Sequence, residues 1–483
     1  MKILYVSSEV VPFAKTGGLA DVAGALPKSL EKLGHDVRVV MPKYKMINDA
    51  KYNIKKIIWD VRVPVGNKNE IAAIYEAKIP NSKVTIYFIE NEKYFGREGL
   101  YQDNGVDYPD NLERFSFFCS AVAEFISNFN WKPEIVHCND WQTALLIPLI
   151  KIKYNWPNVS TVYSIHNMGY LGLFPKDQIN LTGFGWEMFT VDRLEFWDKI
   201  SLAKAGIVFS DVISTVSDSY SKEIQTQEFG CGLDGLMKSR RNYLYGIVNG
   251  LDYEVWNPEK DPFIAKKYGV KSIPLKSENK KALQKANKLP TKSTVPLIGI
   301  ISRLADQKGF DIFSGALDQI MHLECQIVIL GTGEPKYHEL LKSMRKKYPK
   351  HLGLNLGFDS ALAQLIYAGS DMFLMPSRYE PCGLGQLISY KYGTVPIVRK
   401  TGGLADTVHD FDPKTGRGDG FVFEEYSSDA LLDAVGRAID TYKKKKVWKT
   451  LVEKIMCYDY SWEVSARKYA DLYRTAAAAH KGQ

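Results

Sequence analysis

The sequence Lys-Thr-Gly-Gly-Leu-Ala-Asp occurs twice in the chain, at residues 15–21 and again at residues 400–406. An apolar stretch precedes each copy, residues 2–8 before the first and 395–398 before the second, and a helical pattern follows each. Two adjacent glycines let a backbone turn approach a ligand closely, and the lysine brings a positive charge to the same place. We therefore interpret the repeat as one kind of ligand-binding, strand-to-helix turn that the chain builds twice.

Short apolar runs alternate with helical patterns along most of the chain, which predicts parallel sheets with helices on both faces. We expect Pro27 to kink the first helix or to mark its boundary. The expected strands are 3–6, 37–41, 84–89, 135–138, 161–165 and 212–216, then 296–301, 326–330, 372–375 and 395–398; the expected helices include 21–33, 112–129, 308–322, 383–392 and 462–479.

The clearest domain boundary lies at residues 249–258, where turn-forming residues and Pro258 interrupt the regular pattern. We predict an N-terminal domain over 1–247 and a C-terminal domain over 248–459, so that each holds one copy of the repeat. Spacing alone does not decide where the last helix packs. Our prediction places that helix, about 460–483, back on the N-terminal domain.

The amino-acid composition indicates which kinds of ligand the protein can bind and in which cell compartment it is expected. The net charge is +8, from 63 basic and 55 acidic residues spread along the chain, which favours phosphate-bearing small molecules over nucleic acid. The densest basic run, residues 443–446, is expected on the exposed face of a helix. The six cysteines form no Cys-x-x-Cys pair, no leader precedes the first strand, and no apolar run reaches membrane-spanning length. We expect a cytoplasmic protein without a metal site and without a membrane partner.

Polar candidates follow several predicted strands, at the carboxyl edge where open α/β sheets bind ligands. Arg303 and Lys308 follow strand 296–301 and, beside a helix N-terminus, form a candidate phosphate site; two solvated surface cations are the alternative. Glu380 follows strand 372–375 just before a helix, where it is either a chemical group or a carboxylate that interacts with the helix dipole. The other candidates at strand ends are Asp140, His166, Asn167 and a glycine turn at Gly331, each of which also has an ordinary structural interpretation.

The motifs argue against two other classes of protein. Lys400-Thr-Gly402 and Ser29-Leu-Glu-Lys32 imitate the Lys-Thr-Gly and Ser-x-x-Lys motifs of penicillin-binding enzymes, but no Ser-Asp-Asn lies between them and the α/β alternation is wrong for that fold. A dinucleotide-binding fold is disfavoured because neither copy of the repeat extends to Gly-x-Gly-x-x-Gly.

Taken together, the motifs resemble those of the bacterial glycogen synthases and plant starch synthases (glycosyltransferase family 5) nearly from end to end. The matching stretches are 8–22, 110–115, 164–167, 248–252, 302–309, 376–384 and 399–407. The resemblance implies the GT-B fold, in which two Rossmann-like, doubly wound α/β domains face each other across a deep interdomain cleft. It also implies transfer of glucose from ADP-glucose to the 4-hydroxyl at the non-reducing end of an α-1,4-glucan such as glycogen, with retention of configuration and no metal or other cofactor.

The resemblance further implies roles for individual residues. Arg303 and Lys308 would clamp the diphosphate, Glu380 would hydrogen-bond the transferred glucose, and the carbonyl group of His166 would face the sugar. Phe358 would lie against the adenine, and Lys15 would reach in from the N-terminal domain when the domains close. The remaining donor-binding residues would be Gly17, Gly18, Gly331, Cys382, Leu384, Thr401, Gly402 and Gly403, and the sugar and acceptor side would be lined by Asp21, Asp140, Asn167 and Asn249.

The chain departs from the wider pattern of related glycosyltransferases at three places. Ile388 stands where many have a second glutamate, Tyr170-Leu-Gly172 replaces a Tyr-Gln-Gly type run, and Phe95 replaces a tyrosine. Two alternatives stay open: a GT-B enzyme that uses UDP-glucose or another acceptor, and a catalytically silent glucan-binding protein. The joint presence of Lys15, Arg303, Lys308 and Glu380 argues against the second, because a binding module needs no diphosphate clamp. The oligomeric state is not predicted.

Overall fold

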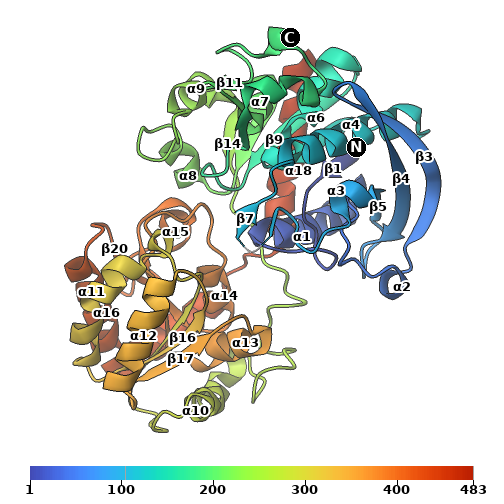
Figure 1. Ribbon diagram of the computed structural model, residues 1–483. Helices are drawn as coiled ribbons and strands as arrows, with labels where there is room; N and C mark the ends of the chain where they lie inside the picture. The colour runs from blue at the N-terminus through green and yellow to red at the C-terminus, as the bar shows by residue number, and fades with distance from the viewer. Residues whose placement is uncertain (104, 482–483) are drawn as a thin grey trace. The chain divides into compact units, whose positions relative to one another are not determined.

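The computed structural model describes residues 1–103 and 105–481, and the chain forms two compact units. Unit 1 comprises Met1–Val216, Ser221–Gly250 and Trp462–Gln483, and unit 2 comprises Ser217–Tyr220 and Leu251–Ser461. The division at Gly250 lies three residues from the predicted boundary at 247. The last helix, α18 (Trp462–Lys481; Figure 1), belongs to unit 1. Its Tyr473 hydroxyl lies 2.8 Å from Nδ1 of the buried His137.

Unit 1 is built on a nine-stranded sheet in the order β14-β13-β9-β8-β1-β2-β5-β4-β3. Its parallel strands are β1 (Lys2–Val6), β2 (Asp36–Pro42), β5 (Thr85–Glu90), β8 (Ile135–Asn139), β9 (Ser160–Ile165), β13 (Val212–Thr215) and β14 (Leu244–Gly246). Ile3, Leu4, Tyr5 and Val6 are completely buried, as expected of a central parallel strand covered on both faces. The predicted parallel core of this domain is confirmed.

One edge of the sheet in unit 1 differs from the prediction. β3 (Lys55–Val65) and β4 (Lys68–Lys78) form a long antiparallel hairpin, and β4 pairs antiparallel with β5. This hairpin curves along one side of the unit (Figure 1). The expectation of purely parallel sheets is therefore wrong here. The sequence pattern predicted no strand here, although residues 57–59 and 71–75 are short apolar runs, because charged residues flank or interrupt them. The hairpin leaves Trp59 69% exposed.

Unit 2 contains a six-stranded, fully parallel sheet in the order β17-β16-β15-β18-β19-β20. Its strands are β15 (Leu297–Ile301), β16 (Gln326–Gly331), β17 (Leu352–Leu356), β18 (Met372–Met375), β19 (Val395–Arg399) and β20 (Phe421–Phe423). The helices that connect or cover them are α10 (Lys276–Ala286), α11 (Phe310–Met321), α12 (Pro335–Lys347), α13 (Ser360–Gly369), α14 (Gly385–Lys391), α15 (Gly402–Thr407), α16 (Ser428–Lys443) and α17 (Lys445–Met456).

Three local expectations need correction. α1 (Gly18–Lys32) continues through Pro27, so the proline does not mark a boundary. The basic run 443–446 spans the junction at which α16 ends and α17 begins, so it does not lie on one helix face, although its side chains are exposed. Lys308 ends a short 3-10 turn, η6 (Asp306–Lys308), and α11 begins only after Gly309, whose φ is +76°. A Cβ at Gly309 would lie 1.9 Å from the Pro376 carbonyl oxygen, so only glycine fits there.

Candidate functional site

Each sheet contains a point at which the strand order reverses. In unit 1 this point lies between β1 and β8, because the chain passes from β1 to β2 on one side of β1 and later adds β8 on its other side. In unit 2 the reversal lies between β15 and β18. Loops at the carboxyl ends of the two strands that flank such a point diverge and leave a crevice. The first copy of the repeat follows β1, and the loop with Glu380 follows β18. The topology therefore selects the same loops as the sequence motifs.

In unit 1 a buried carboxylate shapes the first copy of the repeat. Oε2 of Glu9 accepts hydrogen bonds from the amides of Thr16 (2.5 Å) and Gly17 (3.1 Å), and Oε1 accepts from the hydroxyls of Thr16 (2.6 Å) and Tyr101 (2.7 Å). Glu9 lies within the matching stretch 8–22, but no role was predicted for it from the sequence. An acidic residue a few positions ahead of a glycine turn is the signal that could have identified it.

The lysine and glycines of the first copy are accessible. Lys15 Nζ lies 2.7 and 2.8 Å from the two carboxylate oxygens of Asp21. Lys15, predicted to bind the sugar donor, and Asp21, predicted to line the acceptor side, thus form one ion pair. A Cβ at Gly17 or Gly18 would meet no atom within 4 Å. No packing contact with residues 1–103 or 105–481 therefore requires these glycines, which fits a surface kept open for a ligand.

Asp140 and His166, from the ends of the neighbouring strands β8 and β9, are in direct contact. Asp140 has a φ of +54° and accepts a hydrogen bond from the backbone amide of His166 at 2.8 Å. Desolvation raises the pKa of Asp140 to about 7, although the backbone amides of His166 and Asn167 partly offset it. Asn167 itself accepts from the Gly169 amide at 2.9 Å and so closes the turn.

His166 is a neutral imidazole with a defined tautomer. Burial lowers its pKa to about 4. Its Nε2 lies 3.0 Å from Oδ1 of Asn139, whose Nδ2 donates to the Val6 carbonyl oxygen, so Oδ1 is the acceptor and Nε2 carries the proton. Asn249, after β14, is buried, and its Oδ1 has no hydrogen-bond partner within residues 1–103 and 105–481.

In unit 2 the two residues expected to act on the donor are in direct contact. Lys308 Nζ lies 2.9 and 2.6 Å from the two carboxylate oxygens of Glu380, and the Ser377 hydroxyl donates to Oε2 at 2.9 Å. The side chains of Lys308 and Glu380 are 19% and 9% exposed. They line a cavity of about 160 Å³ with Ile301, Ser302, Tyr367, Leu374, Met375, Pro376, Ser377, Leu384 and Gly385. Neither is thus a solvated surface charge.

The second copy of the repeat is packed backbone to backbone against the Glu380 loop. A Cβ at Gly402, whose φ is +44°, would lie 2.1 Å from the Glu380 carbonyl oxygen, and one at Gly403 would lie 1.9 Å from that of Cys382. The Gly403 amide donates to the carbonyl oxygens of Glu380 and Pro381, both at 3.1 Å. This corrects one expectation: the Gly403 amide already serves the loop and is not available for the donor. The Thr401 side of the turn remains the candidate for binding the donor.

The other predicted residues lie at the same sheet edge with different environments. Arg303 is exposed and donates from Nη2 to Oε1 of Gln307 at 3.0 Å. Phe358, between β17 and α13, is 90% exposed. A Cβ at Gly331 would lie 2.0 Å from the Ser302 carbonyl oxygen, so this glycine lets the ends of β15 and β16 meet closely. Its evident contribution in this structure is packing.

Comparison with known proteins shows which family carries this arrangement. Residues 2–239 match the family described as "Starch synthase catalytic domain", and residues 282–454 match "Glycosyl transferases group 1". Glycogen synthases of Desulforudis audaxviator and Geotalea daltonii are both 46% identical to the chain over 99% of its length, covering 96% and 99% of those proteins. The chain belongs to the glycogen synthase family.

Solved structures agree with this assignment. The catalytic domain of starch synthase IV from Arabidopsis thaliana, bound to ADP and acarbose, is similar with a TM-score of 0.91 at 33% identity over 99% of each chain. Sucrose-phosphate synthase from Thermosynechococcus elongatus shares the fold, with a TM-score of 0.61 at 16% identity. The predicted family and the GT-B fold are thus confirmed. Across the described residues, no helix is long and apolar enough to cross a membrane.

Proposed function

We propose that the protein elongates an α-1,4-glucan by transferring glucose from ADP-glucose to the 4-hydroxyl at the non-reducing end, with retention of configuration. The glycogen synthase relatives support the reaction, and the ADP in the Arabidopsis structure supports the donor. The structural observation that carries the proposal is the half-buried Lys308–Glu380 pair, which lies at the strand-order reversal of unit 2.

The positive charges of unit 2 suit departure of a nucleoside diphosphate. Cations and amide dipoles that are already in place stabilise the negative charge as it develops on the leaving group, without reorganisation during the reaction. We assign this task to Lys308, whose position is fixed by Glu380, and to Arg303, oriented by Gln307. Reliance on these side chains in place of a metal is part of the proposal.

Glu380 is better suited to positioning the sugar than to attacking it. Three hydrogen bonds to its carboxylate lower its nucleophilicity, because each must be weakened before a covalent bond to carbon forms. We propose that the departing phosphate helps to deprotonate the acceptor hydroxyl and that the glucose is held by Glu380. Trapping a covalent glucosyl adduct on Glu380 would contradict this part.

Unit 1 supplies groups suited to a sugar rather than to a phosphate. His166 is neutral, and Asp140 has a pKa near neutrality, so both can exchange hydrogen bonds with hydroxyl groups. Lys15 is the exception, since its ammonium group lies on the accessible turn of the first copy. We propose that Lys15 exchanges Asp21 for a donor phosphate when the substrate binds.

The test is a transfer assay with glycogen as primer and either ADP-glucose or UDP-glucose as donor. We expect incorporation from ADP-glucose to exceed that from UDP-glucose by at least tenfold, and anomer-specific analysis of the product to show only α-linkages. A reversed donor preference would leave the transfer reaction standing and move the donor assignment to UDP-glucose. The absence of turnover with both donors would refute the synthase assignment.

We also propose a cytoplasmic location. None of the six cysteines, all of which lie in the described part of the chain, forms a disulfide bond, and Cys119, Cys138, Cys325 and Cys382 are buried. Thiols without disulfide partners are typical of reducing compartments.

A further inference from the structure

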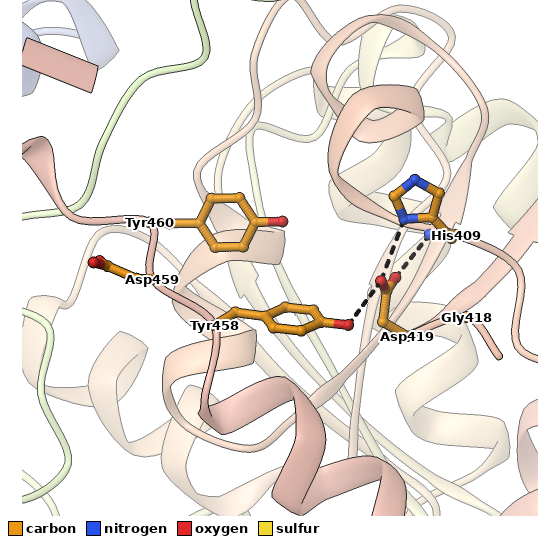
Figure 2. A pocket seen from close by; sticks show the side chains of 6 residues that line it. All are labelled: His409, Gly418, Asp419, Tyr458, Asp459 and Tyr460. Atoms are coloured by element: carbon orange, nitrogen blue, oxygen red, sulfur yellow. Dashed lines mark hydrogen bonds and ion pairs between the residues drawn. The ribbon is translucent and has the colours of Figure 1, made fainter. Parts of the chain in front are cut away.

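A second cavity in unit 2 has no part in the site described above. It has a volume of about 500 Å³ and is lined by His409, Gly418, Asp419, Tyr458, Asp459 and Tyr460 (Figure 2). None of these residues lines the Lys308–Glu380 cavity. Its size falls within the range of small-molecule sites in proteins.

The wall of this pocket is organised by a buried carboxylate. Oδ1 of Asp419 accepts from the His409 amide (2.7 Å) and the Tyr390 hydroxyl (2.8 Å), and Oδ2 accepts from the Tyr458 hydroxyl (3.2 Å) and lies 3.3 Å from His409 Nδ1. With four donors around it, Asp419 holds its neighbours in place before any ligand arrives. Such preorganisation reduces the entropy cost of binding.

Two tyrosines form the aromatic part of the pocket. Tyr458 and Tyr460 alternate along an extended segment, so their rings project to one side, toward Asp419 and His409, while Asp459 projects to the other (Figure 2). The two ring centroids are 6.2 Å apart with an interplanar angle of 79°. Tyr460 stacks on the buried Tyr390 at 6.0 Å and 13°. Both pocket tyrosines are half-buried, which leaves part of each ring for contact. The Tyr458 hydroxyl donates to Asp419, and the Tyr460 hydroxyl donates to the Thr407 carbonyl oxygen at 3.5 Å, so each hydroxyl can still accept a hydrogen bond.

The lining matches a neutral sugar better than an ion. A pyranose presents apolar C–H groups on its faces and hydroxyl groups around its edge, and it therefore needs aromatic surface beside hydrogen-bonding groups. The carboxylate disfavours an anion, and its oxygens are already engaged. Among the described residues, no group of three or more His, Cys, Asp or Glu side chains is arranged to hold a metal ion.

We propose that this pocket is a second saccharide site, which holds glucosyl units of an α-glucan away from the end that is being elongated. The inference rests on the proposed function for the identity of the glucan. His409, whose side chain is 67% exposed, would hydrogen-bond sugar hydroxyls through its Nε2 while Nδ1 faces Asp419. Tyr458 and Tyr460 would contact the sugar ring, and the Tyr460 hydroxyl, which donates to the Thr407 carbonyl oxygen, would accept a hydrogen bond from a sugar hydroxyl. A site of this kind raises the local concentration of chain ends and favours long, branched acceptors over short ones.

The test compares the wild-type chain with His409→Ala, Tyr460→Phe and the double variant. Because His409 is exposed and the Tyr460 ring stays stacked on Tyr390, we expect all variants to fold, and thermal unfolding measures this directly. The matched control is His322→Ala, an exposed histidine in the same unit at the end of α11. Binding is measured by retardation in native gels that contain glycogen, without donor, and transfer is measured with glycogen and with maltotriose.

Removal of one hydrogen bond to sugar should weaken glycogen binding about three- to tenfold per variant. The KM for glycogen should rise by the same factor while the KM for maltotriose does not, and His322→Ala should match the wild type. Unchanged retardation in the double variant, or equal rises in both KM values, would overturn the second site. If the wild type elongates glycogen, such a result leaves the proposed function intact. If the wild type neither elongates nor binds glycogen, the proposed function fails as well.

Discussion

Replacing Lys308 by alanine separates the structural role of the Lys308–Glu380 pair from its chemical role. The substitution removes two of the three hydrogen bonds to the Glu380 carboxylate and leaves only that from Ser377. Because the Glu380 side chain is 9% exposed, water cannot fully replace the ammonium group. Breaking a buried ion pair on one side costs about 3–5 kcal/mol, and the accessible side of this pair places the expected loss near the lower end, about 3 kcal/mol.

Activity should fall by more than this loss of stability explains. If Lys308 stabilises the departing diphosphate, its removal lowers kcat by about 10² to 10³, as found when one preorganised donor is removed from an active site. The second variant, Lys308→Ala with Glu380→Gln, removes the unpaired charge. It should recover most of the stability, because glutamine needs no counter-ion, and it should recover none of the activity.

The assay is a double-mutant cycle. Free energies of unfolding come from denaturant titration of the wild type, both single variants and the double variant, and kcat comes from transfer at saturating ADP-glucose and glycogen. The control is Lys280→Ala, which breaks another buried ion pair of unit 2, to Asp371 at 2.6 Å with 6% and 13% exposure. It should lose comparable stability while the folded fraction keeps its kcat. Recovery of kcat in the double variant, in parallel with its stability, would show that Lys308 acts only through the fold.

Three further outcomes follow from the structure. The folded-state pKa of Asp140 is raised to about 7, so the stability that this group contributes is complete below about pH 4 and is lost as the pH rises through 7. The free energy of unfolding should therefore change by about 4 kcal/mol across this range. Asp140→Asn should abolish the change in denaturation experiments between pH 4 and pH 8. Gly403→Ala should destabilise the protein by more than about 2 kcal/mol, because the new Cβ would meet the Cys382 carbonyl oxygen. The equivalent substitution in the first copy, Gly18→Ala, should be neutral or stabilise α1 by about 0.5 kcal/mol. Similar unfolding midpoints for the two variants would contradict the packing difference between the copies. Phe358→Ala should raise the KM for ADP-glucose about tenfold and leave the unfolding midpoint unchanged, because the ring is 90% exposed. A lowered unfolding midpoint with an unchanged KM would instead show that the ring contributes to packing.

Much of the fold was accessible from the sequence because its signals are local. Buried parallel strands such as β1 and β15 are short continuous apolar runs, and the polar residues that follow them mark the ligand-binding edge of the sheet. The family followed from motifs that the comparisons confirm. The β3–β4 hairpin was missed because Asp60 and Arg62 interrupt β3 and charged residues flank the short apolar run 71–75 of β4. Of the two expectations for Pro27, a kink or a helix boundary, the boundary is wrong, because α1 continues through the proline.

By itself, the sequence determined the α/β class, the family and the loops that carry the candidate residues, because periodicity and motif spelling are properties of neighbouring residues. Only the tertiary structure decided how those residues are used. It showed that Lys308 forms an ion pair with Glu380 and that Glu9 shapes the first copy of the repeat. It also showed that the two identical heptapeptides differ in packing: the glycines of the first copy face open space, and those of the second lie against the Glu380 loop. The physical reason is that a residue's contacts come from strands far apart in the chain, so identical sequences acquire different partners.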